Sequence, residues 1–131
     1  MALGTVAWKL PELSSVHDQA NFYLGQPAAE HQLAGARAWD IDVRILDAAA
    51  SAIPRNATFA VLVGTKDLTY SNRYTPDAVP GYITYWLLPR RNVQDPHRAD
   101  WVVSYGGDLA GIALSRRIDV APGLTVAEVK R

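Results

Sequence analysis

Cysteine is missing from this chain of 131 residues, so disulfides, thiol catalysis and thiolate metal sites are excluded. No run of 18 or more apolar residues occurs, and we expect no bilayer-spanning segment within the sequence. Neither sign of charge is in excess, because thirteen basic residues balance thirteen acidic ones. Without a basic surplus, electrostatics gives no reason to expect nucleic acid as a partner, and we expect none.

Metal-binding and catalytic patterns are also scarce. The three histidines, His17, His31 and His97, are far apart, and none pairs with another at helical spacing. A zinc site would need them brought together with carboxylates, so surface or helix-capping roles are the simpler interpretation. Neither a nucleophile-elbow serine nor a phosphate-binding glycine motif is present. We therefore expect no metal, no cofactor and no catalytic residue.

Two apolar runs are the strongest indication of the fold. Thr58–Gly64 and Ala99–Gly106 are rich in β-branched and aromatic residues and do not alternate apolar with polar. This pattern is typical of strands covered on both faces, as in parallel sheets. The spacer between them holds a helix candidate, Asp77–Leu88, which Asp77 would cap and Pro89 would end. The sequence thus predicts a βαβ core with parallel strands.

Helices are expected before this core. The predicted segments cover residues 16–24, a stretch that begins at Pro27 and includes Trp39, and residues 43–53. Asp42 would be the N-cap of the last of these helices. Residues 1–13 lack a clear period and are interpreted as a leader or linker.

The chain is expected to close with a β-hairpin. Its strands would cover residues 117–120 and 124–129, joined by a Pro122–Gly123 turn of a kind that suits type II. The predicted fold class is therefore α/β, with N-terminal helices, a βαβ core and a C-terminal hairpin. A length of this size fits one domain, which we place at residues 14–131.

Two tryptophans are expected in the core. Trp101 lies in the second apolar run, and Trp86 lies on the helix that should cover it. Their large side chains would bury much apolar surface there.

Polar and glycine residues follow both apolar runs. Gly64–Asp67 begins at the last residue of the first run, and Ser104–Asp108 covers the end of the second run and the two residues after it. Parallel neighbours bring their carboxyl ends to one edge of the sheet, which is where open α/β sheets bind ligands. The glycines would leave backbone donors open to an anion, and an arginine could meet an anion or stack on a ring. The candidate ligand-binding residues are Asp67, Arg73, Tyr105, Gly106, Gly107 and Asp108. Ordinary turns with a polar surface are the alternative.

The order of several segments resembles a known class of domains. These segments are Tyr23–Gly25, Ile53–Val61, Tyr85–Arg91 and Ala99–Gly106. They contain I-P-x-x-A before a strand, L-L-P-R at the end of a helix, and A-D before a hydrophobic strand. The pattern resembles the soluble extracytoplasmic segments that follow the last transmembrane helix in bacterial polytopic membrane proteins, glycosyltransferase-like proteins among them. In glycosyltransferases of that type the catalytic carboxylates lie in the membrane part, so no catalytic residue carries over.

The resemblance implies a function for the chain. It implies a non-catalytic accessory domain of a longer protein, on the extracytoplasmic face of a bacterial membrane. Its partners would be segments of the parent membrane protein and a carbohydrate. The alternative from the residues themselves is a small-ligand binding module for a sugar phosphate or a nucleotide, for which a free cytoplasmic domain stays open. A small enzyme is the third class, and it lacks a recognisable catalytic constellation.

Overall fold

The computed structural model describes residues 27–131. The predicted leader at residues 1–13 and the predicted helix at 16–24 lie outside the described residues. The chain divides into two compact units, residues 1–38 and 39–131. The described part of the first unit is helix α2, Pro27–Ala38, which begins at Pro27 as predicted. The expectation of one domain over residues 14–131 stays a prediction.

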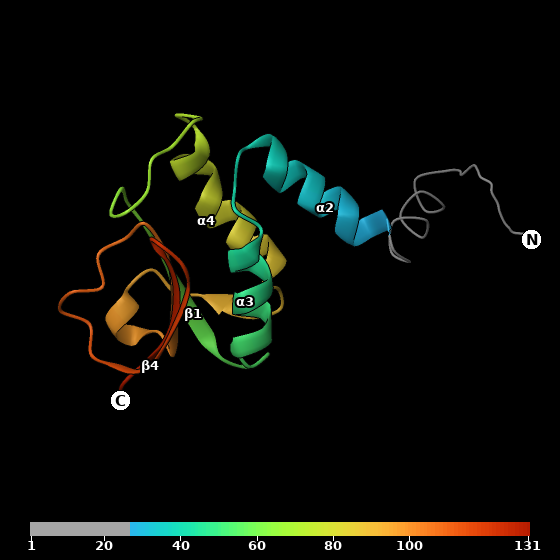
Figure 1. Cartoon of the computed structure of the whole chain (residues 1–131). Coiled ribbons are helices and arrows are strands. Elements are labelled where there is room, and N and C mark those ends of the chain that lie inside the picture. Colours follow the sequence, from blue (N-terminus) through green and yellow to red (C-terminus); the bar gives the residue numbers. More distant parts are fainter. Residues whose placement is uncertain (1–26) are drawn as a thin grey trace, which may run out of the picture. The chain divides into compact units, whose positions relative to one another are not determined.

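A five-stranded mixed sheet forms the basis of the second unit (Figure 1). Its strands are β1 (Thr58–Val63), β2 (Arg91–Asn92), β3 (Trp101–Tyr105), β4 (Leu114–Ala121) and β5 (Leu124–Val129). The order across the sheet is β2-β1-β3-β5-β4. Strand β1 pairs in parallel with β2 and β3, and the remaining pairs are antiparallel. The mixed α/β class and the parallel pairing of the two apolar runs are therefore confirmed.

Both faces of this sheet are covered, which explains why β3 is buried at all five positions. Helices α3 (Arg44–Ala52) and α4 (Thr75–Trp86) lie against one face, and the 3-10 turn η2 (Pro96–Arg98) lies on the other (Figure 1). On the second face, Leu109 and Ile112 pack against a buried cluster of the sheet. A strand between two such layers has no wet face, so its sequence does not alternate.

The helix-covered face holds the larger core side chains. Ala60 and Val102 belong to the cluster on the opposite face, so the alternate residues Phe59 and Val103 point toward the helices. Val102 is the one residue of the opposite cluster among the largest fully buried side chains of the described residues, which are Phe59, Ile45, Leu46, Ile53, Ile83, Leu87, Leu124, Val79, Val102, Val103 and Val126. Burying one such side chain contributes about 1.5–3 kcal/mol.

Helix α4 begins at Thr75, two residues before the predicted start. Asp77 therefore lies in its first turn and not at the N-cap, which is Tyr74. Thr75, Val79 and Ile83 recur every four residues and form the buried stripe of the helix. Among residues 27–131, no helix has the length and apolar character needed to cross a membrane.

The two tryptophans expected in the core differ in how deeply they are buried. Trp101 is 3% exposed, as predicted. Trp86 lies beside the buried stripe of α4 and is only partly buried, so the prediction of a core position for it is wrong. Leu87, the next residue along the chain, occupies that core position instead.

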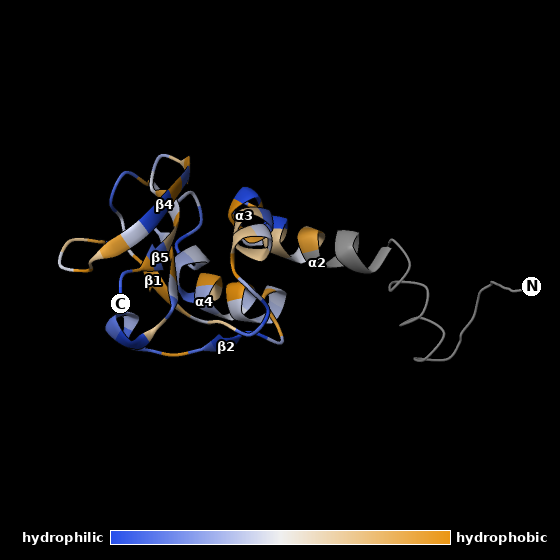
Figure 2. Ribbon diagram, turned by 90° about the horizontal axis from the view of Figure 1, so that it is seen from below, coloured by the Kyte–Doolittle hydropathy of each residue, from blue (hydrophilic) through white to orange (hydrophobic). Residues whose placement is uncertain are grey.

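The predicted terminal hairpin is confirmed. Strands β4 and β5 pair antiparallel, and Pro122 and Gly123 connect them. Gly123 has a φ of 81°, the left-handed value that the third position of a type II turn requires. Strand β4 begins at Leu114, earlier than expected, and carries both hydrophobic and hydrophilic residues (Figure 2).

The sequence interpretation did not include β2. Arg91 and Asn92 pair with the start of β1 directly after helix α4. The guanidinium of the preceding residue, Arg90, lies at the carboxyl ends of helices α3 and α4. It donates to the carbonyls of Ile53 (2.8 Å), Ala50 (3.0 Å) and Leu87 (3.3 Å). These are carbonyls that a helix leaves without partners at its carboxyl end.

Asp100 joins three parts of the chain. Its carboxylate accepts from the Thr58 backbone N–H (2.9 Å) and hydroxyl (3.1 Å), and it pairs with Arg131. The Asp100 backbone N–H in turn donates to the Thr58 hydroxyl at 3.0 Å. The hydrogen bond from the Thr58 N–H, with those from Arg131 and the Thr58 hydroxyl, holds the pKa of Asp100 below its usual value of 3.8.

Acid should therefore weaken the contacts of the Asp100 carboxylate with Thr58 and Arg131. A lowered folded-state pKa stabilises the protein above the unfolded value, and that contribution is lost as pH falls through the folded pKa. We expect the urea midpoint of the native chain to fall more than that of Asp100→Asn between about pH 5 and pH 3. Asp47→Asn, an exposed change on α3, controls for the altered net charge. Equal pH dependence in the native chain and Asp100→Asn would contradict this role.

Candidate functional site

The loops after β1 and β3 meet at one edge of the sheet, as the sequence predicts. The Gly64 N–H donates to the Tyr105 carbonyl at 3.1 Å, and the Lys66 N–H donates to the Gly106 carbonyl at 2.9 Å. A further bridge joins Val63 to Gly106. The two loops on which the candidate residues lie are therefore in direct contact.

The glycines at this edge serve close packing. The Gly106 N–H donates to the Gly123 carbonyl at 2.7 Å, and the Gly107 N–H donates to the Ser104 hydroxyl at 3.1 Å. A Cβ on Gly64 would lie 2.5 Å from the Gly106 carbonyl oxygen. The prediction that these glycines leave backbone donors open to an anion is wrong, because their N–H groups are used within the fold.

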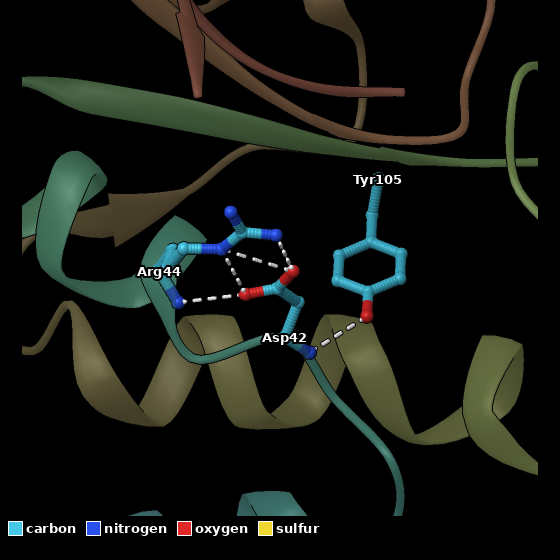
Figure 3. A network of polar contacts seen from close by, with 3 residues as sticks. All are labelled: Asp42, Arg44 and Tyr105. Carbon is cyan, nitrogen blue, oxygen red and sulfur yellow. Dashed lines mark hydrogen bonds and ion pairs between the residues drawn. The ribbon is translucent and has the colours of Figure 1, made fainter. Parts of the chain in front are cut away.

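Tyr105 has its ring inside the protein and is 4% exposed. Its hydroxyl accepts from the Asp42 backbone N–H at 2.8 Å (Figure 3). Its ring stacks with that of Tyr70 at 6.2 Å between centroids, and the Tyr70 hydroxyl donates to the Gly64 carbonyl at 2.5 Å. Burial raises the pKa of both phenols. Tyr105 therefore anchors the chain before α3.

The start of α3 is fixed beside Tyr105. Arg44 donates to the Asp42 carboxylate from Nε (3.0 Å), Nη2 (2.6 Å) and the backbone N–H (3.1 Å), as Figure 3 shows. These bonds hold the pKa of Asp42 below its usual value. The N-cap position itself is Val43, one residue after the predicted Asp42, although the Asp42 carboxylate does bind the first turn.

Arg73 and Asp108 are both exposed and make local contacts. The Arg73 guanidinium donates to the Tyr74 hydroxyl at 2.6 Å and lies 4.8 Å from the centroid of that ring. Tyr74 in turn meets Trp39 edge-to-face. The Asp108 carboxylate accepts from the Ala110 N–H at 2.9 Å and lies 4.0 Å from the Lys66 ammonium.

A groove of about 840 Å³ opens on the sheet face opposite the helices. Ser104, Thr125 and Asp119 form one row across β3, β5 and β4, and they line the groove. This row has the same orientation as Val102 and Ala127, which belong to the cluster under Leu109. The complete lining is Lys66, Asp67, Ser104, Gly107, Leu109, Ala110, Gly111, Ile112, Leu114, Arg117, Asp119, Ala121, Pro122, Gly123 and Thr125.

Both polar and apolar side chains line the groove. The Asp119 carboxylate accepts from Arg117 Nε at 2.8 Å and from the Thr125 hydroxyl at 2.9 Å, and these two bonds lower its pKa. The Ser104 hydroxyl accepts from Gly107 and finds no acceptor for its own proton among the described residues. Leu109, Ile112 and Leu114 are the larger apolar side chains of the lining. Such a surface can bind hydroxyl groups and pack a hydrocarbon face.

Two of the six predicted residues, Asp67 and Gly107, line this groove. The other four lie elsewhere on the loops or in the interior. Sequence reasoning missed Thr125, Arg117 and Asp119, and it treated Ser104 only as the start of a loop. A signal was present in the strands, because Ser104 and Thr125 are polar residues within otherwise apolar runs.

Within residues 27–131, no three acidic or histidine side chains are placed to hold a metal ion. His97 lies at the surface, 3.3 Å from the Asp95 carboxylate and 3.2 Å from the Gly111 carbonyl, in agreement with the predicted surface role. Comparison of the chain with protein-family models, with curated proteins and with solved structures finds no match. The resemblance to membrane-protein domains stays a prediction, and the groove is the feature of the structure that points to a function.

Proposed function

We propose that this chain is a binding domain that holds a small polar ligand in the groove over β3, β5 and β4. The observation that carries the proposal is a pair of hydroxyls at the base of the groove. Ser104 is 2% exposed and Thr125 is 5% exposed, on strands whose other inward residues are apolar. Burying polar groups in such strands is costly unless they make hydrogen bonds, and binding sites use a few placed polar groups of this kind.

Both functions expected from the sequence can use this groove. In an accessory domain of a bacterial membrane protein, on the extracytoplasmic face, the groove would contact a carbohydrate presented by the parent protein. In a free-standing module it would hold the ligand by itself. The proposal is one of binding, because the polar side chains of the lining can form hydrogen bonds with the hydroxyl groups of a ligand.

Amide chemical shifts of the full chain provide the test. Neutral sugars, sugar phosphates and nucleotides are added at concentrations on the order of millimolar, and we expect at least one class to shift the amides around Ser104 and Thr125. Thr125→Val should weaken that binding by roughly tenfold. The change removes the Thr125 hydroxyl from the groove, and with it the hydrogen bond that this hydroxyl donates to the Asp119 carboxylate.

Matched controls come from the site predicted by the sequence. Arg73→Ala and Asp108→Ala remove candidate residues that do not line the groove, and we expect each to leave binding unchanged. The proposal fails if no ligand class shifts the groove amides. It also fails if these two variants weaken binding while Thr125→Val does not, since the ligand would then lie on the exposed loops.

A further inference from the structure

The charges of the groove set the class of ligand that it can accept. Lys66 and Arg117 supply two positive charges to the lining, and Asp67 and Asp119 supply two negative ones. The Arg117 guanidinium is already bonded to the Asp119 carboxylate at 2.8 Å. A phosphate would therefore compete with the Asp119 carboxylate for the Arg117 guanidinium and would meet two carboxylates, which is unfavourable for an anion.

Backbone donors do not compensate for this balance. Phosphates often bind the open N–H groups of glycine loops. Here the N–H groups of Gly106 and Gly107 donate to the Gly123 carbonyl and the Ser104 hydroxyl. The lining residues also include no aromatic ring on which a base could stack.

The remaining chemistry suits hydroxyl groups on a ring. A carboxylate accepts from a hydroxyl while a guanidinium or ammonium donates to one, so the Arg117–Asp119 pair can bind both halves of a vicinal diol. The Ser104 hydroxyl adds a donor at the base. Leu109 and Ile112 from the loop and Leu114 from β4 add hydrocarbon to the same lining, which a C–H-bearing ring face can contact.

We infer that the ligand of the groove is an uncharged cyclic polyol, of the kind formed by a neutral pyranose ring. Phosphorylated sugars and nucleotides are disfavoured. This inference rests on the proposed function, since it specifies what the same groove binds. It concerns the selectivity between neutral and anionic ligands, which the proposal of binding alone does not fix.

Paired titrations of the full chain test the inference. The probes are the methyl glycosides of glucose, galactose and mannose, glucose 6-phosphate, and AMP. We expect at least one glycoside to bind about tenfold more tightly than glucose 6-phosphate. We also expect its affinity to change little between about 0.05 and 0.5 M salt, because no net charge is neutralised.

A charge variant sharpens the comparison. Asp119→Asn keeps an acceptor for Thr125 but leaves Arg117 without its carboxylate, so the groove gains a positive charge. Glycoside affinity should then fall about tenfold while glucose 6-phosphate affinity rises. Asp95→Asn makes the same change in net charge outside the groove lining and should alter neither affinity.

The possible outcomes distinguish the selectivity of the groove from its role as a binding site. Tighter, salt-sensitive binding of glucose 6-phosphate or AMP in the groove would overturn the inference and leave the proposed function intact. Binding of no probe in the groove, or shifts confined to another face, would overturn both. Glycoside binding that responds to Asp119→Asn and not to Asp95→Asn supports both.

Discussion

Gly64→Ala is expected to destabilise the protein by about 3 kcal/mol, the upper part of the usual range for overpacking. A Cβ at this position would lie 2.5 Å from the carbonyl oxygen of Gly106 and 3.3 Å from its carbon. Both are backbone atoms of the neighbouring loop, so no side-chain rotation relieves the overlap. The loops would have to separate, which weakens the hydrogen bonds from the N–H groups of Gly64 and Lys66.

Gly81→Ala is the matched control. Gly81 lies within α4, and no atom would come within 4 Å of an added Cβ. Alanine in a helix interior is more favourable than glycine by about 0.5–1 kcal/mol, so this variant should become more stable. Urea unfolding followed by tryptophan fluorescence measures both changes. Similar midpoints for the two variants would show that the contact between Gly64 and Gly106 tolerates a methyl group.

The parallel strands were predictable because the cause acts locally. A strand with helices on one face and a loop layer on the other has no wet side, and its sequence shows this directly. Residues 58–63 and 101–105 both lack alternation, and they pair in parallel in register from Phe59–Trp101 to Val63–Tyr105. The hairpin was predictable for a similar reason, since Pro122 and Gly123 define a local turn.

The role of the glycines could not be read from the sequence. A glycine after a strand has the same signature whether it cradles an anion or lets two backbones touch. Gly64, Gly106 and Gly123 come from three distant segments, and a Cβ on either of the last two would also meet the side chain of Leu68. The contacts that decide between the two roles depend on tertiary register, which no local pattern reports.

The groove was partly predictable. Ser104 and Thr125 interrupt apolar strands, and a buried hydroxyl in such a place needs a partner. The pairing of Thr125 with Asp119 depends on the hairpin register, which places the two residues opposite each other. The expected edge of the sheet was close to the site, as Asp67 and Gly107 show. The face was missed because the loop that carries Leu109 and Ile112 has no secondary-structure signal.

The sequence predicts helix α4 correctly but assigns the wrong residue, Trp86, to the core. The segment around Trp86 is apolar nearly all round, so it gives no clear direction to its buried face. The four-residue spacing of Val79, Ile83 and Leu87 indicates that face, and Trp86 lies next to it. Size and hydrophobicity alone therefore favoured the wrong neighbour.

Trp101→Ala is expected to cost about 3–5 kcal/mol of stability, the range for an aromatic side chain removed from a core that cannot collapse. Trp101 lies in the central strand β3, between Phe59 on β1 and Glu128 on β5. The Arg116 guanidinium on β4 lies 5.0 Å from the centroid of its ring. Because the neighbouring strands hold the backbone in place, truncation should leave a cavity and also remove the cation–π contact.

Trp86→Ala provides the comparison, since it removes the same side chain from a partly buried position on α4. We expect a clearly smaller loss, because part of the ring is already in water and solvent can fill the space. Far-UV circular dichroism in urea measures both variants, as each removes a fluorescent reporter. Arg116→Met, which keeps the aliphatic cover over Trp101, should lose about 0.5–1 kcal/mol and isolates the cation–π contribution. A loss below about 1 kcal/mol for Trp101→Ala would contradict its position in the core, and so would a loss no greater than that of Trp86→Ala.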